Sequence, residues 1–121
     1  MRVLIADDHL PFTEVVRAML EPEEEIEIVG AVPDGEQALE LVRDLRPNAV
    51  VMDISMPRLD GIEATRRIHE EVPETHVLIL TGSNAPEDVE RARDAGAEAY
   101  LTKEQIASHL VPALLALCRT G

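Results

Sequence analysis

The sequence has few aromatic residues, a single cysteine and no long apolar run. Tryptophan is absent, and Phe12 and Tyr100 are the only other large aromatic residues, which excludes the stacking platforms that bind single-stranded nucleic acid. The lone thiol of Cys118 excludes an internal disulfide and zinc sites built on several thiolates. No apolar run is long enough for a transmembrane helix or a signal peptide. We therefore expect a cytoplasmic protein.

Positive charge is also scarce. The chain of 121 residues has 11 Lys and Arg against 24 Asp and Glu, for a formal net charge of −13. Such a surface repels phosphate backbones and anionic lipid, so we expect no direct binding of nucleic acid and no membrane docking. The length fits one domain, residues 1–121.

Two patterns alternate along the chain. Short apolar runs without a polar break lie at 3–6, 49–52 and 77–80 and indicate strands covered on both faces, as in a parallel sheet. An alternating run at 26–29 suits an edge strand, and a weaker fifth run lies at 99–101. Helical periodicity separates the runs. Five strand–helix pairs joined by right-handed crossovers predict an α/β fold, a doubly wound sandwich.

Capping residues and prolines set the expected helix starts. Two pairs of residues resemble capping boxes, Asp34 with Gln37 and Asp60 with Glu63. Asn84 is a candidate cap for a helix with Pro86 in its first turn. Because a proline is tolerated best in the first turn, Pro112 predicts that the last helix begins near Ser108.

Polar side chains follow the predicted strands where each strand ends: Asp7, Asp8, Asp53, Thr81 and Lys103. Parallel strands bring their carboxyl ends to one edge of the sheet, where doubly wound folds bind ligands. We therefore expect these side chains to form one site. Each residue alone has a plainer reading, as a turn residue, a helix cap or a surface lysine.

The three carboxylates indicate a metal site. Clustered like charges need a cation to neutralise them, and hard oxygen ligands on short side chains suit Mg²⁺ together with phosphate oxygens. Asp53 could then act as a nucleophile toward phosphorus. Thr81 could hydrogen-bond a phosphoryl oxygen, and the Lys103 ammonium could pair with a carboxylate or a phosphate.

These residues resemble the receiver domain of bacterial two-component response regulators over essentially the whole chain. The similarity rests on five motifs: Val3-Leu4-Ile5-Ala6-Asp7-Asp8-His9, Val50-Val51-Met52-Asp53-Ile54-Ser55-Met56-Pro57, Asp60-Gly61, Leu80-Thr81-Gly82, and Gly96-Ala97 before Tyr100-Leu101-Thr102-Lys103. The Asp-Asp-His motif and the lysine without a following proline are similar to the NarL/FixJ (LuxR-type) class. The resemblance implies a flavodoxin-like (βα)5 fold with strand order 2-1-3-4-5.

The resemblance also implies a role for each site residue. The residue matching Asp53 accepts a phosphoryl group from a sensor histidine kinase, in a reaction that the domain catalyses on itself without being a conventional enzyme. Asp8, Asp53 and the backbone carbonyl of Ser55 match the ligands of Mg²⁺, and Asp7 matches a residue that acts through water. The residues matching Thr81 and Lys103 hold the phosphoryl oxygens.

A switch is implied as well. In the family, the residue matching Thr81 moves toward the phosphoryl group and the aromatic matching Tyr100 turns inward, which changes the face formed by the fourth helix, fifth strand and fifth helix. Plain packing in an edge strand is the alternative for Tyr100. Regulators of this class usually carry a helix-turn-helix output domain. We therefore expect the N-terminal domain of a longer transcription regulator, which contacts its own DNA-binding domain and forms a homodimer on phosphorylation.

Other functions fit the residues less well. A stand-alone receiver that acts through protein contacts is open, as is a degenerate receiver that is not phosphorylated. A small Mg²⁺-dependent phosphatase with Asp53 as nucleophile is disfavoured, because such enzymes carry the nucleophile on the first strand. A flavin-binding module is rejected, because Asp7 and Asp8 would repel the cofactor's phosphate.

Overall fold

A five-stranded parallel sheet forms the centre of the protein. The computed structural model describes residues 1–54, 56, 58–82 and 85–119. The strands are β1 (Arg2–Ala6), β2 (Glu27–Val32), β3 (Ala49–Asp53), β4 (His76–Thr81) and β5 (Ala99–Thr102). They pair in parallel in the order β2-β1-β3-β4-β5. The predicted flavodoxin-like doubly wound fold is confirmed.

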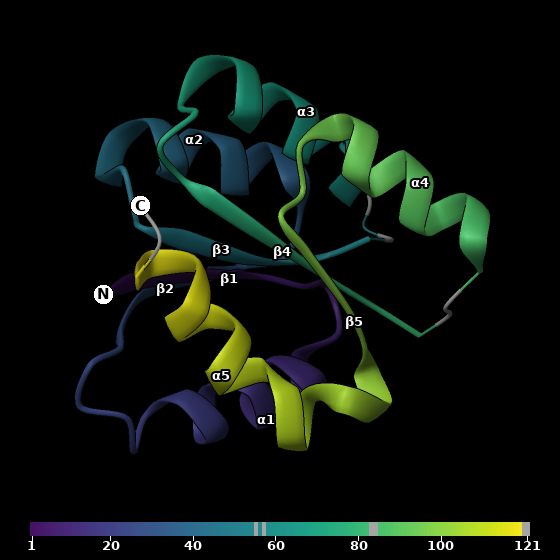
Figure 1. The fold of residues 1–121 in the computed structure, drawn as a ribbon. Helices are drawn as coiled ribbons and strands as arrows, with labels where there is room; N and C mark the ends of the chain where they lie inside the picture. The colour runs from purple at the N-terminus through teal and green to yellow at the C-terminus, as the bar shows by residue number, and fades with distance from the viewer. Residues whose placement is uncertain (55, 57, 83–84, 120–121) are drawn as a thin grey trace.

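Helices cover both faces of the sheet. They are α1 (Leu10–Leu20), α2 (Gly35–Leu45), α3 (Gly61–Glu71), α4 (Pro86–Ala95) and α5 (Ile106–Arg119), with a 3-10 turn, η1 (Lys103–Gln105), before α5. Figure 1 shows α1 and α5 on one face and α2, α3 and α4 on the other. Within the described part of the chain, none of these helices has the length and apolar character needed to cross a membrane.

The central strands are apolar throughout because both of their faces are buried. In β1, Val3 and Ile5 pack into the core beneath α1 and α5, whereas Leu4 and Ala6 pack into the core beneath α2, α3 and α4. All four side chains are at most 1% exposed. Alternation of side chains between two dry faces explains the unbroken apolar runs of the sequence.

The second strand is longer than predicted. The alternating pattern placed it at 26–29, but β2 runs from Glu27 to Val32 and pairs with β1 as far as Ala6. The register shifts between Val3 and Leu4, and Leu4 then lies opposite Gly30. The small Gly30 interrupts the polar–apolar alternation while the backbone pairing continues, which is why the pattern ended too early.

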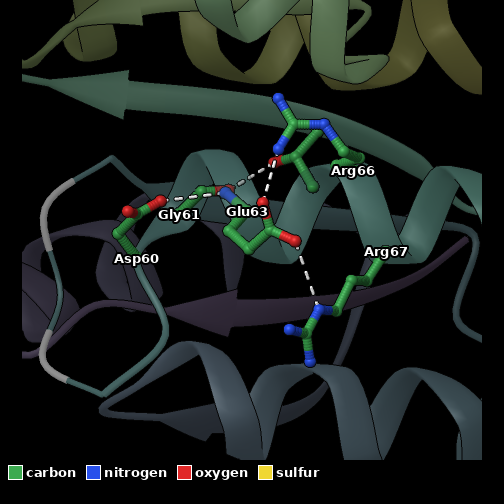
Figure 2. A network of polar contacts seen from close by, with 6 residues as sticks. Asp60, Gly61, Glu63, Arg66 and Arg67 are labelled. Carbon is green, nitrogen blue, oxygen red and sulfur yellow. Dashed lines mark hydrogen bonds and ion pairs between the residues drawn. The ribbon is translucent and has the colours of Figure 1, made fainter.

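Both predicted capping boxes form only in part. Asp34 caps α2 by accepting a hydrogen bond from the Gln37 backbone N–H at 2.9 Å, and the Gln37 side chain returns to the Asp34 carboxylate. Asp60 likewise accepts a bond from the Glu63 backbone N–H, at 2.8 Å. The Glu63 carboxylate turns instead to Arg66 and Arg67, one turn further along α3 (Figure 2).

Two other predicted helix starts have different outcomes. Asn84 lies outside the described residues; α4 begins at Pro86, with Ala85 at the capping position. The predicted start near Ser108 is wrong, because α5 begins at Ile106 and contains Pro112 in its interior. Pro112 is exposed, so its ring meets solvent and water can satisfy the carbonyl that loses an N–H partner.

Two glycines permit close contact between the β3–α3 loop and its neighbours. A Cβ atom on Gly35, the first residue of α2, would lie 2.1 Å from the carbonyl oxygen of Leu59. A Cβ on Gly61, the first residue of α3, would lie 2.1 Å from the carbonyl oxygen of Asp53. In both cases the obstacle is backbone, which cannot rotate away. The loop after Asp53 is thus held at both ends by contacts that only glycine allows.

Replacing Gly35 by alanine should therefore destabilise the domain. We expect Gly35→Ala to lower the free energy of unfolding by about 1–3 kcal/mol, because the methyl group forces the β3–α3 loop away from α2. The matched control is Gly82→Ala, since a Cβ at Gly82 meets nothing within 4 Å. Urea unfolding followed by far-UV circular dichroism measures both. Equal stability of the two variants would contradict the close contact.

Candidate functional site

The polar residues that follow the strands converge on one edge of the sheet. Asp53 ends β3, Thr81 ends β4, and Asp7 directly follows β1. Pairing of Ala6 with Met52, and of Thr81 with Thr102, places these strand ends side by side. Lys103 begins η1 immediately after β5.

Three carboxylates form the centre of this edge. Oxygen atoms of Asp7, Asp8 and Asp53 all lie within 4.8 Å of one another. Asp7 and Asp53 are each only 6% exposed, whereas Asp8 is exposed. Three negative charges this close, two of them largely removed from water, repel one another strongly.

The environment of Asp7 fits a cation. Its Oδ1 accepts a hydrogen bond from the His9 backbone N–H at 2.8 Å. Its Oδ2 is buried and has no hydrogen-bond partner among the described residues, a costly state for a carboxylate oxygen. A hard divalent ion at the cluster would offset that cost, so the donor set fits Mg²⁺. His9 itself occupies the N-cap position of α1.

A single ammonium group faces the carboxylates. Lys103 Nζ lies 3.9 Å from Asp7 Oδ2 and 4.4 Å from the centre of the Phe12 ring. The Lys103 side chain is 29% exposed, so part of its charge is shielded from water. The turn that carries it is fixed by a hydrogen bond from the Thr102 backbone N–H to Gln105 Oε1, at 3.0 Å.

The structure also connects Thr81 with Tyr100. Thr81 is 2% exposed, and Tyr100 lies half-buried on the neighbouring strand. Burial raises the pKa of the Tyr100 phenol above its ordinary value, a hydrogen bond with the Thr81 side chain opposes that rise, and the charge of Asp88 adds to it. The buried hydroxyl and the sole tyrosine are therefore in direct contact.

The loop between Asp53 and α3 is tied to α2 by charge. Arg58 Nε lies 3.8 Å from Asp34 Oδ2, and Arg58 has a φ of 69°, a conformation uncommon for residues other than glycine. The Gln37 backbone N–H holds the pKa of Asp34 below its ordinary value against the effect of burial, and the Arg58 charge lowers it further. The predicted metal-ligand carbonyl of Ser55 belongs to this loop but lies outside the described residues.

Sequence reasoning missed three of these contacts. It did not pair Phe12 with Lys103 or Asp34 with Arg58, because no local pattern joins residues so far apart in the chain. The hydrogen bond between Thr102 and Gln105 could have been predicted from the sequence, since a threonine followed three residues later by glutamine is a capping-box pattern.

Comparison with known proteins identifies the class. The family model described as "Response regulator receiver domain" matches residues 3–115. The chain therefore belongs to the receiver domain family of response regulators, as the sequence motifs predicted. Receiver domains of this family interact with sensor kinases and generally bind Mg²⁺ through acidic residues.

Two curated relatives show the settings in which similar chains occur. The chain is 37% identical over 121 residues to the transcriptional regulatory protein DegU of Brevibacillus brevis, covering 100% of this chain and 51% of that protein. It is 40% identical over 111 residues to a protein-glutamate methylesterase/protein-glutamine glutaminase of Syntrophus aciditrophicus, covering 89% of this chain and 31% of that protein. The chain thus spans about half of the first relative and a third of the second.

Solved structures agree with this placement. A two-component response regulator of the LuxR family from Aurantimonas superposes with a TM-score of 0.93 at 33% identity, over 98% of this chain and 85% of that chain. The isolated receiver domain of RcsB from Salmonella enterica, solved with the phosphomimetic BeF₃⁻, superposes with a TM-score of 0.90 at 30% identity, over 98% of this chain and 88% of that chain. The predicted NarL/FixJ (LuxR-type) resemblance is confirmed.

Mg²⁺ should stabilise the wild-type domain. A ligand present at about ten times its Kd adds roughly 1.4 kcal/mol to the free energy of unfolding, so Mg²⁺ should raise Tm by several degrees and EDTA should reverse the rise. Asp8→Asn should remove most of this gain while making the metal-free domain no less stable, because one repelling charge is lost. Differential scanning calorimetry at constant ionic strength tests both effects. An equal Mg²⁺ shift in Asp8→Asn would contradict the site.

The sole tyrosine offers a direct titration. We expect the Tyr100 phenol to ionise above its ordinary pKa, with a further rise in Thr81→Val, because that variant loses the hydrogen bond that lowers the pKa. A raised folded-state pKa means that the neutral phenol's contribution to stability is complete below the unfolded-state pKa and is lost as pH rises through the folded-state value. Ultraviolet difference absorbance of the phenolate measures the midpoint. A midpoint unmoved by Thr81→Val would contradict the contact.

Proposed function

We propose that this domain is a phosphorylation-activated switch whose acceptor is Asp53. A sensor histidine kinase would supply the phosphoryl group from a phosphohistidine. An Asp53 carboxylate oxygen forms the new bond to phosphorus, the phosphorus–nitrogen bond breaks, and the imidazole leaves as a neutral base after taking a proton. The observation that carries this proposal is the cluster of Asp7, Asp8 and Asp53 within 4.8 Å, faced by the Lys103 ammonium.

The roles of the residues follow from charge. Asp8 and Asp53 would hold Mg²⁺ with the Ser55 carbonyl, and Asp7 would contribute through water; the bound ion would neutralise oxygens of the phosphoryl group. Lys103 supplies the opposing positive charge, and the Thr81 hydroxyl donates a hydrogen bond to a phosphoryl oxygen. Because charge spreads over the equatorial oxygens during transfer, such fixed positive groups and donors accelerate it.

The contact between Thr81 and Tyr100 supports a switching role. Phosphorylation adds negative charge and acceptor oxygens at Asp53, which draws the Thr81 hydroxyl toward the new group. Tyr100 is hydrogen-bonded to Thr81 and lines a cavity of about 80 Å³ with Val89 and Arg93 between α4 and β5. A shift of Thr81 therefore reaches the surface formed by α4, β5 and α5, which is the proposed output face.

Transcription is the output we propose, since DegU is a transcriptional regulatory protein. In this reading residues 1–121 are the N-terminal receiver of a longer cytoplasmic regulator with a helix-turn-helix domain, and phosphorylation promotes a homodimer. The methylesterase relative shows that a similar chain also occurs beside a different activity. A stand-alone receiver is the alternative for the same site.

Intact mass after incubation with acetyl phosphate and Mg²⁺ tests the acceptor. We expect one added phosphoryl group on the wild type and none on Asp53→Asn or in the presence of EDTA. Asp44→Asn, which removes a carboxylate from α2 away from the strand ends, is the matched control and should be modified like the wild type.

The outcomes separate the alternatives. Equal modification of Asp53→Asn would show that the acceptor is another residue. Failure of the wild type with acetyl phosphate and with a panel of phosphorylated histidine kinases would favour a degenerate receiver. Continued release of inorganic phosphate from small phosphate esters over many turnovers would favour the phosphatase.

A further inference from the structure

The Lys103 ammonium lies close to both the Phe12 ring and the Asp7 carboxylate. We propose that Phe12 is a positioning residue for Lys103, holding the ammonium at the carboxylate cluster through a cation–π contact. This inference deepens the proposed function and rests on it. It assigns a task in phosphoryl transfer to a side chain of α1 that belongs to none of the predicted ligands or switch residues.

Both partners of the contact are fixed to the backbone. Phe12 is the third residue of α1, and its backbone N–H donates to the His9 carbonyl at 3.0 Å. Its ring packs partly buried against the core beneath α1 and α5. The backbone of Lys103 lies in the turn that is held by the hydrogen bond between Thr102 and Gln105. The ring and the base of the lysine side chain therefore have set positions, and only the flexible lysine chain is left to place the ammonium.

The carboxylate alone does not fix that ammonium. The distance of 3.9 Å between Lys103 Nζ and Asp7 Oδ2 exceeds hydrogen-bond length, so the attraction has little directional preference. The lysine chain is partly exposed and has many rotamers. The negative face of the Phe12 ring, whose centre lies 4.4 Å from Nζ, gives the cation a second attraction besides that of the carboxylate. The two attractions together limit the ammonium to the space beside the acidic cluster.

A set of substitutions tests this role by transfer rate. Phe12→Leu removes the π face and keeps an apolar side chain, so the initial rate of phosphorylation by acetyl phosphate should fall about two- to fivefold, the range expected for an exposed cation–π contact. Phe12→Tyr should restore the rate because it restores the ring. In a Lys103→Met background, Phe12→Leu should cause no further loss. Met19→Leu, elsewhere on α1, should leave the wild-type rate unchanged.

Nuclear magnetic resonance tests the placement without phosphorylation. An ammonium held over the ring brings the Lys103 ε-methylene protons near the shielding face of the ring. Their resonance in the wild type should therefore lie upfield of the same resonance in Phe12→Leu. Phe12→Tyr should keep the upfield position. Thermal unfolding of each variant shows whether α1 remains packed.

The outcomes distinguish a failure of the Phe12 role from a failure of the proposed phosphorylation switch. A wild type that is phosphorylated while Phe12→Leu matches its rate would overturn the inference alone. So would an equal rate loss from Phe12→Leu with and without Lys103, since the ring would then act through packing. A wild type that gains no phosphoryl group would overturn the proposed function and with it any role of Phe12 in transfer, whereas an upfield Lys103 resonance would still support the placement.

Discussion

The repulsion among three carboxylates at one edge of a buried sheet is the constraint on which the site depends. Asp7 and Asp53 cannot move into water without unravelling the ends of β1 and β3, because the preceding residues of both strands are buried on two faces. Only the exposed Asp8 has that freedom. The fold therefore maintains a concentrated negative charge, which creates a requirement for positive charge at the same place.

That requirement explains the surroundings of the cluster. Lys103 faces it from the turn after β5, and the buried Oδ2 of Asp7, which accepts no hydrogen bond from the described residues, fits a divalent ion. On the other side, the β3–α3 loop is held against the backbone at Gly35 and Gly61. Fixed groups stabilise a transferring phosphoryl group better than mobile ones, because no reorganisation is needed during the reaction. The stability of the sheet is thus used to hold charges in a fixed arrangement.

Much of the fold could be predicted from the sequence because burial leaves a local pattern. The apolar runs at 3–6, 49–52 and 77–80 located three strands correctly, since strands covered on both faces have no polar break. The pattern failed at two residues whose local signal did not match the backbone structure. Gly30 hides the continuation of β2, and the exposed position of Pro112 lets α5 extend through a residue that ordinarily ends a helix.

The site, too, could be predicted from the sequence only in part. The strand-end rule places Asp7, Asp53 and Thr81 together because parallel pairing alone determines where their backbones lie. It places Lys103 at the same edge, but it says nothing about where a long flexible side chain directs its charge. That direction depends on the Phe12 ring and the Asp7 oxygen, which come from other segments of the chain. Sequence patterns therefore predict the positions of short, stiff side chains at this edge, whereas the placement of the one flexible cation needs the packed structure.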